Sequence, residues 1–259
     1  MSKRPRSPSE VAHQIASLGV RPGDVVLAHV SYRAARPITG GPAGLLAGLQ
    51  EAVGPQGTLV MPSSTGEDDR LFEPSATPAD PDLGVVADTL WRLPGVMRSD
   101  HRFAFAARGP VAPEVTSDPI AFPPHGIASP VARVLQRDGR VLLVAVGHEA
   151  NTTIHLAELL AGVRYRRPKH YSVLVNGLPK RVDYEENDHC CGRFGLMDGW
   201  LRAERLQAEG PVGHADARLV DARDVVDCAL ARLGRDPTLF LHEQGSGCEE
   251  CDDAWRSLR

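Results

Sequence analysis

The stretch "DVVLAHVSYRAARPITGGPAGLLAGLQEAVGPQGTLVMPS", residues 24–63, decides the fold class. It opens on an apolar run of strand length, passes through an apolar helical segment at 43–54 and closes on a second apolar strand at 57–63. A strand, a helix and a strand in this order form a β-α-β unit with parallel strands and a right-handed crossover. The sequence therefore predicts an α/β protein.

Further elements extend this unit in both directions. Ser7, Pro8 and Glu10 form a capping box that predicts a helix ending at Gly19. Asn176-Gly177 separates two alternating runs over 170–185, which is typical of a β-hairpin. We expect a single domain over residues 1–259, with a mixed, partly parallel sheet flanked by helices and an added hairpin. Further helices are expected at 83–93 and 129–139, and a buried strand at 140–147.

Composition limits the possible partners. The 259 residues carry a net charge of −4 with the signs interspersed, which argues against a nucleic-acid groove. The basic N-terminus is not followed by an apolar signal region, and no segment has the length of a membrane span. We therefore expect a cytoplasmic protein that binds neither nucleic acid nor membrane. The oligomeric state is left open by the sequence.

The most suggestive stretch is "GHEANTTIHLAELLAG", residues 147–162, which follows the strand at 140–147. Asn151 is a good N-cap for a helix from Thr152 to about Ala161, so the stretch forms a strand-loop-helix corner. Ligands of open α/β sheets bind at such corners, where helix N-terminal amides favour anions. His155 falls in the first turn, where the helix dipole favours a neutral imidazole that can act as a base. The backbone amides of 147–153 are candidate oxyanion donors.

Spacing alone does not establish a catalytic site. The His-x-x-Glu spacing that begins at His155 is more often a surface pair than a catalytic pair. The acidic run "DYEENDHCC" at 183–191 offers carboxylates that would orient the imidazole or receive a cationic substrate, although such runs are commonly solvated turns. The Pro-rich loop at 122–130 is a further candidate part of a site.

Ordered motifs connect these segments to a known family. The segments are "LAHVSYRAARPITGGPAG" from Leu27, "DLGVVADTLWRL" from Asp82, "SPVARVLQRDGRVLLVAVGHEANTTIHLAEL" from Ser129 and "ENDHCCGRF" from Glu186. Together they resemble the aminoglycoside 3-N-acetyltransferases of the antibiotic N-acetyltransferase family, and the cysteine pattern is most similar to the apramycin-acetylating branch. The resemblance implies a fold unlike that of the GNAT acetyltransferases. It also implies transfer of an acetyl group from acetyl-CoA to the 3-amino group of the 2-deoxystreptamine ring of aminoglycosides, which confers antibiotic resistance.

The resemblance also implies roles for individual residues. His155 would be the catalytic histidine and Glu186 the carboxylate that orients it. The substrate amine would meet Asp188. Apart from the resemblance, the negative charges of Glu185, Asp68 and Asp69 would attract a polycation, although the run that contains Asp68 and Asp69 is equally typical of a solvated loop. Val30 replaces the first serine of the family's coenzyme corner, where a valine would pack instead of donating a hydrogen bond. The coenzyme would be bound by Ser31, Tyr32, Arg33, Thr152, Thr153 and Ser129.

The cysteines suggest a separate site. Cys248 and Cys251 have the C-x-x-C spacing of half a zinc site, and the "HCC" segment at 189–191 would supply the remaining ligands. Cys190 and Cys191 are the expected pair, with His189 as an alternative ligand. We expect a structural zinc that fixes the C-terminal tail, with free thiols or a reversible disulfide as the alternative. Cys228 lies in an amphipathic run and is expected to be a core residue.

Two other classes of function use similar residues. A metal-dependent amide hydrolase would need at least three converging ligands, and the sequence contains no H-x-H or H-E-x-x-H motif. A non-catalytic polycation-binding protein would share the acidic segments but would not need a tuned histidine.

Overall fold

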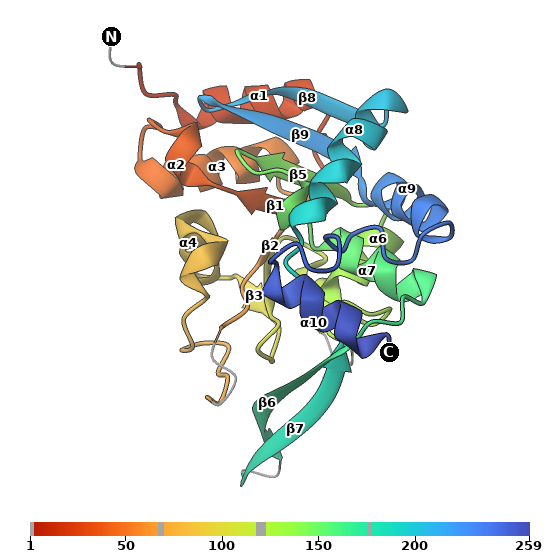
Figure 1. Ribbon diagram of the computed structural model, residues 1–259. Coiled ribbons are helices and arrows are strands. Elements are labelled where there is room, and N and C mark those ends of the chain that lie inside the picture. Colours follow the sequence, from red (N-terminus) through yellow and green to blue (C-terminus); the bar gives the residue numbers. More distant parts are fainter. Residues whose placement is uncertain (1–2, 67–69, 118–122, 176–177) are drawn as a thin grey trace.

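The computed structural model describes residues 3–66, 70–117, 123–175 and 178–259. Within these ranges, seven strands form one sheet in the order β3-β4-β2-β1-β5-β9-β8 (Figure 1). Strand β1 pairs in parallel with β2 and β5, and the other neighbours pair antiparallel. The sheet is mixed and partly parallel, as predicted. Its strands are β1 (Val25–Val30), β2 (Thr58–Pro62), β3 (Met97–Arg98), β4 (Phe105–Arg108), β5 (Arg140–Val144), β8 (Gln207–Val212) and β9 (Ala215–Asp221).

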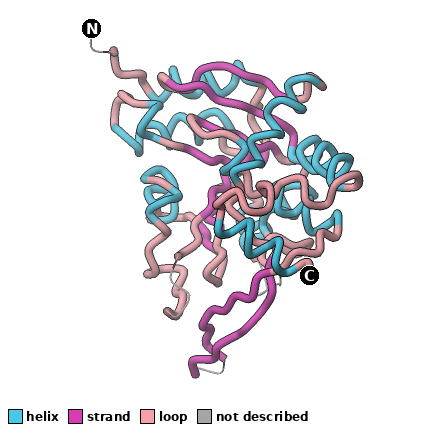
Figure 2. Tube along the Cα trace, viewed as in Figure 1, coloured by secondary structure: helices cyan, strands magenta, loops and turns pink. Residues whose placement is uncertain are grey.

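Helices cover both faces of this sheet (Figure 2). Side chains alternate along the central strands, so Val26 of β1 joins the core under α1, α3 and α4, and Leu27 joins the core under α5 to α10. Both faces of the central strands are thus buried, which explains their nearly continuous apolar sequences. The helices are α1 (Pro8–Leu18), α2 (Tyr32–Ala35), α3 (Gly41–Val53), α4 (Val85–Trp91), α5 (Ala112–Thr116), α6 (Pro130–Gln136), α7 (Thr153–Ala161), α8 (Leu196–Ala203), α9 (Ala222–Leu233) and α10 (Glu249–Ser257).

The predicted N-terminal capping box is present. The Ser7 side chain accepts from the Glu10 backbone, the Glu10 carboxylate accepts from the Ser7 backbone, and Gly19 ends α1 in the left-handed conformation. Helix α1 then packs closely on α3. A Cβ atom at Gly48 would lie 2.6 Å from Cγ1 of Val11, so a larger residue at 48 would separate the two helices.

The predicted hairpin is also present. Strands β6 (Arg167–Val175) and β7 (Leu178–Glu186) form their own two-stranded sheet, which extends away from the body of the molecule at the bottom of Figure 1. Residues 176–177, where the sequence predicts the turn, lie outside the described ranges. The far end of β7 returns the chain to the body at the segment 187–191, which carries several of the residues discussed below.

No helix of the described residues is long and apolar enough to cross a membrane. The single-domain assignment over residues 1–259 remains a prediction from the sequence.

Candidate active site

The predicted strand-loop-helix corner positions the central histidine. Strand β5 ends at Val144, a short 3-10 turn follows at His148–Ala150, and α7 begins at Thr153. The Asn151 side chain accepts a hydrogen bond from the Thr153 backbone at 3.1 Å, but the N-cap of α7 is Thr152, one residue later than predicted. His155 therefore lies in the first turn of α7, beyond the carboxyl end of a central strand.

The carboxylate that contacts His155 is Glu158, not Glu186. Oε2 of Glu158 lies 2.9 Å from Nδ1 of His155, one turn further along α7. This pair has the His-x-x-Glu spacing that is usual on helix surfaces, but here the Glu158 side chain is fully buried. The assignment of Glu186 as the orienting carboxylate is therefore wrong, because a carboxylate in the same helix already occupies the position next to the imidazole.

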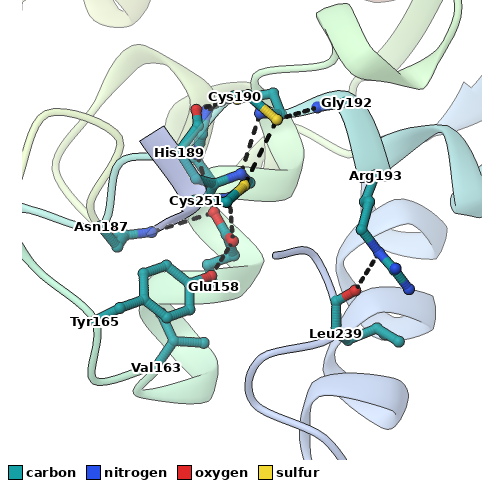
Figure 3. Close-up of polar contacts among 12 residues, drawn as sticks. Glu158, Val163, Tyr165, Asn187, His189, Cys190, Gly192, Arg193, Leu239 and Cys251 are labelled. Atoms are coloured by element: carbon teal, nitrogen blue, oxygen red, sulfur yellow. Dashed lines mark hydrogen bonds and ion pairs between the residues drawn. The ribbon is translucent and has the colours of Figure 1, made fainter. Parts of the chain in front are cut away.

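Four donors surround the Glu158 carboxylate. Oε1 accepts from the Tyr165 hydroxyl at 2.5 Å and from Nε2 of His189 at 2.9 Å. Oε2 accepts from His155 and from the Asn187 amide at 3.2 Å. Figure 3 shows Tyr165, Asn187 and His189 converging on Glu158. Although burial opposes ionisation, the hydrogen bonds from His155 and His189 lower the pKa of Glu158 to about 2. All four lone-pair positions of the carboxylate are used, which fixes its orientation.

This network determines the proton positions on both imidazoles. Nδ1 of His189 accepts from the Cys191 backbone N–H at 3.1 Å, so its Nε2 carries the proton that is donated to Glu158. Nδ1 of His155 donates to Glu158, which leaves Nε2 as its basic nitrogen. That nitrogen faces the sulfur of Cys191 at 3.4 Å. The site therefore presents one oriented imidazole nitrogen beside a thiol.

The protonation of His155 differs from the sequence expectation. Burial lowers its pKa, but Cys191 and Glu158 outweigh burial and raise the pKa well above 6.5. The helix dipole favours a neutral imidazole, but Cys191 and Glu158 are closer to the ring and have the larger effect on its pKa. His155 is thus a stronger base than a first-turn histidine alone would be.

A second histidine, which the sequence analysis did not single out, stacks on the first. The ring of His125 lies 5.1 Å from the ring of His155, and burial with the nearby His155 lowers the pKa of His125 to about 3. His125 belongs to the Pro-rich loop at 122–130, which the sequence indicates as a candidate part of the site. Oε1 of Glu186 lies 4.0 Å from Nδ1 of His125, and burial raises the pKa of this carboxyl. Glu186 therefore lies beside His125, and it is close enough to His155 for the imidazole to act on the pKa of this carboxyl, which it lowers.

The other predicted substrate carboxylates have different environments. Asp188 accepts from Arg167 at 2.9 Å and from Lys169 at 2.5 Å, so two cations of the chain already offset its charge. Glu185 is exposed on β7. Asp68 and Asp69 lie outside the described residues.

A cavity of about 630 Å³ opens at the carboxyl ends of β1 and β2. Four of the predicted coenzyme residues line it, namely Ser31, Tyr32, Arg33 and Thr152. Arg36, which was not predicted, also lines the cavity. Within the described ranges, neither Arg36 nor Arg33 forms an ion pair with an acidic side chain. Thr152 directly precedes α7, the helix that carries His155, so the cavity lies beside the start of that helix, although His155 itself is not among its lining residues.

Two predicted coenzyme residues do not line this cavity. Ser129 is fully buried, and its hydroxyl accepts from the Ala132 backbone as the N-cap of α6. It is therefore a helix cap, and the coenzyme role assigned to it is wrong. Thr153 is also buried, and its hydroxyl has no hydrogen-bond partner among the described residues. Val30, which stands in place of a serine, packs against the cavity wall.

Some of the expected oxyanion donors are already engaged. The amide of Gly147 donates to Glu149 at 2.7 Å, and the amide of Thr153 donates to Asn151. The amides of Ala150 and Asn151 donate to backbone carbonyls of the same turn. These four amides hold the corner together, so oxyanion stabilisation by the 147–153 backbone would have to come from its other amides.

The cysteines group differently from the prediction. Cys190, Cys248 and Cys251 come together with His242, and their ligand atoms all lie within 4.8 Å of one another. Cys191 points the other way, toward His155. Its assignment as a metal ligand is wrong because adjacent residues in this turn face opposite directions. Cys228 is buried in α9, as predicted.

Comparison with known proteins identifies the family of the chain. The profile of the family described as "Aminoglycoside 3-N-acetyltransferase" matches residues 27–234. The chain belongs to the aminoglycoside 3-N-acetyltransferase family. It is 58% identical to aminoglycoside N(3)-acetyltransferase IV from Salmonella sp. over 92% of each chain. The family resemblance predicted from the sequence is thereby confirmed, and the chain is an enzyme of this class.

Solved structures of this acetyltransferase class share the fold. Aminoglycoside acetyltransferase AAC(3)-IVa, with one histidine replaced by alanine and in complex with a gentamicin, matches with a TM-score of 0.97 and 56% identity over 99% of each chain. The same enzyme in complex with apramycin matches with a TM-score of 0.91 and 54% identity, covering 97% of this chain and 100% of the other. The architecture described above is thus that of known aminoglycoside acetyltransferases.

Proposed function

We propose that the enzyme transfers the acetyl group of acetyl-CoA to the 3-amino group of the 2-deoxystreptamine ring of aminoglycosides, with His155 as the general base, and so confers resistance. The observation that carries this proposal is the orientation of His155. Its Nδ1 is bound to the buried Glu158, and its Nε2 remains as the basic atom on α7, the helix that starts beside the cavity that Thr152 lines.

The chemistry requires a proton acceptor at this place. An aminoglycoside ammonium has no lone pair, so it must lose a proton before its nitrogen attacks the thioester carbonyl carbon. Nε2 of His155 passes that first proton to solvent, and when the new C–N bond forms and the C–S bond breaks, the same atom accepts the second proton from the nitrogen. The departing CoA sulfur then takes a proton from the imidazolium, which returns His155 to its starting state. The transfer is direct and needs no acetyl-enzyme.

The cavity beside Thr152 suits the coenzyme. CoA carries several phosphates, and the guanidinium groups of Arg33 and Arg36 supply positive charge at the cavity wall. The apolar part of the wall, which includes Val30 and Met61, suits the pantetheine arm. We therefore assign acetyl-CoA binding to this cavity, with Ser31 and Tyr32 as further contacts.

The aminoglycoside would approach from the side of β7. The similar enzymes bound to a gentamicin and to apramycin support these two drugs as candidate substrates. Glu186, which lies beside His125 near the base, and the exposed Glu185 would receive the ammonium groups of the polycation. Asp68 and Asp69 remain proposed contacts. Asp188 would contribute less, because Arg167 and Lys169 already neutralise it.

A hydrolytic metal site at the same place is less well supported. His155, Glu158 and His189 offer ligand atoms within 4.8 Å of one another. However, all four acceptor positions of Glu158 are occupied by protein donors, and Nε2 of His189 is one of these donors. Family membership also argues against both a hydrolase and a non-catalytic polycation-binding protein.

The test is thiol release from acetyl-CoA in the presence of apramycin, gentamicin, tobramycin or kanamycin. Wild-type enzyme should release thiol only when an aminoglycoside is added. In His155→Ala the rate should fall about 10²–10⁴-fold, the usual effect of losing a general base, while acetyl-CoA still binds. His13→Ala, at an exposed position on α1, is the matched control and should keep the wild-type rate. A His155→Ala rate within a few-fold of wild type would refute the proposal.

A further inference from the structure

Three segments far apart in the sequence bring four soft ligands together. Cys190 follows the hairpin, His242 lies in the loop after α9, and Cys248 and Cys251 lie at the start of α10. Cys251 is fully buried, and the other three ligand residues are partly buried. Figure 3 shows Cys190 and Cys251 side by side.

The spacing of these atoms is that of a tetrahedral metal site. Zn–S bonds of about 2.3 Å and Zn–N bonds of about 2.0 Å place two sulfurs about 3.8 Å apart, and a sulfur and a nitrogen about 3.5 Å apart, in a regular tetrahedron. The Cys190 and Cys251 sulfurs are 3.6 Å apart. Nδ1 of His242 lies 3.2 Å from the Cys190 sulfur and 3.5 Å from that of Cys251. The three distances fit one central ion.

Backbone groups support the sulfurs as they do around bound metals. The Gly192 amide donates to the Cys190 sulfur at 3.5 Å, and the Cys251 amide donates to the sulfur of Cys248. Such hydrogen bonds stabilise thiolates, which are the metal-binding form of cysteine. The indole of Trp255 on α10 donates to the His242 carbonyl at 2.8 Å, which holds the histidine-bearing loop against the tail helix.

A disulfide explains the arrangement less well. A disulfide needs sulfurs about 2.05 Å apart, uses two of the three cysteines and gives no role to His242. A cytosolic setting, as expected from the sequence, also disfavours a structural disulfide.

We propose that Cys190, His242, Cys248 and Cys251 bind one structural zinc ion, and that Cys191 is not a ligand. Four protein ligands leave no open position, so this zinc serves folding and not acetyl transfer. The ion would tie α10 to the segment that follows the hairpin. Because Cys190 precedes Cys191, the ion would also fix the turn that places the Cys191 sulfur against His155.

The test measures metal in untagged protein that is purified without chelator. Elemental analysis should find about one zinc per chain, and His242→Ala and Cys248→Ser should each lose it. His242→Cys should retain zinc, because four thiolates also form a closed site. Cys191→Ser and Cys228→Ser are the matched controls, since they remove thiols outside the proposed ligand set and should keep the metal.

A second measurement uses wild-type protein, so it does not depend on whether a variant folds. Removal of zinc by a chelator should lower Tm by roughly 10 °C, because structural zinc contributes its binding free energy to folding, and added Zn²⁺ but not Mg²⁺ should restore it. Replacement by Co²⁺ should give the strong visible absorption of a tetrahedral thiolate site. If protein purified from cells grown with added zinc contains less than about 0.1 zinc per chain, the proposal is overturned. Loss of zinc from Cys191→Ser together with its retention in His242→Ala would overturn the ligand set.

Discussion

The carboxylate of Glu158 lies 2.9 Å from Nδ1 of His155, one turn further along the same helix. Helix α7 therefore carries both the proposed base and the group that orients it. Their relative position depends on one continuous segment of regular backbone, and the three other donors to Glu158 come from Tyr165, Asn187 and His189. A misplaced hairpin or tail would thus disturb the base through its carboxylate.

Replacement of Glu158 tests whether this carboxylate orients His155 or binds the substrate. In Glu158→Gln, the amide presents one acceptor and one donor to four hydrogen-bond donors, so His155 loses its fixed tautomer. We expect kcat to fall about 10²–10⁴-fold with a smaller change in KM, and Tm to fall because buried donors lose their acceptor. Steady-state kinetics and a thermal melt measure both effects.

Glu186→Gln is the matched comparison. Because Glu186 contacts His125 and the hydrogen bond to Nδ1 of His155 comes from Glu158, we expect mainly a higher KM for the aminoglycoside. A kcat loss in Glu186→Gln as large as that in Glu158→Gln would show that Glu186 acts on the base, and would contradict the reassignment made from the structure.

The pH dependence should reflect the raised pKa of His155. Burial lowers this pKa, but Cys191 and Glu158 raise it well above 6.5 overall. A base acts only after it has lost its proton, so kcat/KM should rise with pH through an apparent pKa above 6.5. In Cys191→Ser, which removes one of the two groups that raise the pKa, the rise should move to lower pH. A profile that stays in place in Cys191→Ser would argue that the sulfur does not affect the base.

Buried neutral histidines should make the fold sensitive to acid. Burial and the nearby His148 lower the pKa of His29 to about 3, against 6.5 in the unfolded chain. Between these values the unfolded chain binds the proton and the folded chain does not. The contribution is therefore complete above pH 6.5 and is lost as the pH falls toward 3, by up to about 1.4 kcal/mol per pH unit.

Urea unfolding at pH 7.5 and pH 5.0 measures this loss. The free energy of unfolding should decrease less between the two pH values in His29→Gln than in wild type, because glutamine does not titrate. The exposed His13→Gln should behave as wild type. Equal decreases in wild type and His29→Gln would exclude His29 as a source of acid sensitivity.

Arg33 tests the assignment of the coenzyme cavity. If its guanidinium binds a CoA phosphate, Arg33→Ala should raise the KM for acetyl-CoA roughly 10- to 150-fold and leave kcat nearly unchanged, since a hydrogen bond to a charged group contributes roughly 1.5–3 kcal/mol. Arg21→Ala changes an exposed arginine that does not line the cavity and serves as the control. An unchanged KM for acetyl-CoA in Arg33→Ala would place the phosphates elsewhere.

Local signals in the sequence were sufficient for most of the fold. The capping box at Ser7 and the β-α-β unit at 24–63 depend on nearby residues and on apolar periodicity, and both are present in the structure. The start of α7 differs from the prediction by one residue, because the N-cap is Thr152 and Asn151 binds the Thr153 amide from just outside the helix.

The site was harder to predict because its partners are distant in sequence. The spacing of His155 and Glu158 was visible, but spacing does not reveal burial, and burial distinguishes this pair from an ordinary surface pair. His242 belongs to no motif and joins the cysteines only through tertiary packing. Cys191 was grouped with Cys190 because adjacent letters do not show that their side chains diverge.

The full set of protein donors around Glu158 has a consequence for how such an enzyme evolves under drug pressure. No drug needs to touch this carboxylate, so mutations that admit a new aminoglycoside have no reason to alter it. Substitutions can accumulate at the rim of the site, here the end of β7 with Glu185 and Glu186. His155 and Glu158 on α7 would stay constant. New resistance spectra are therefore expected to arise at the rim and to leave the acid–base machinery unchanged.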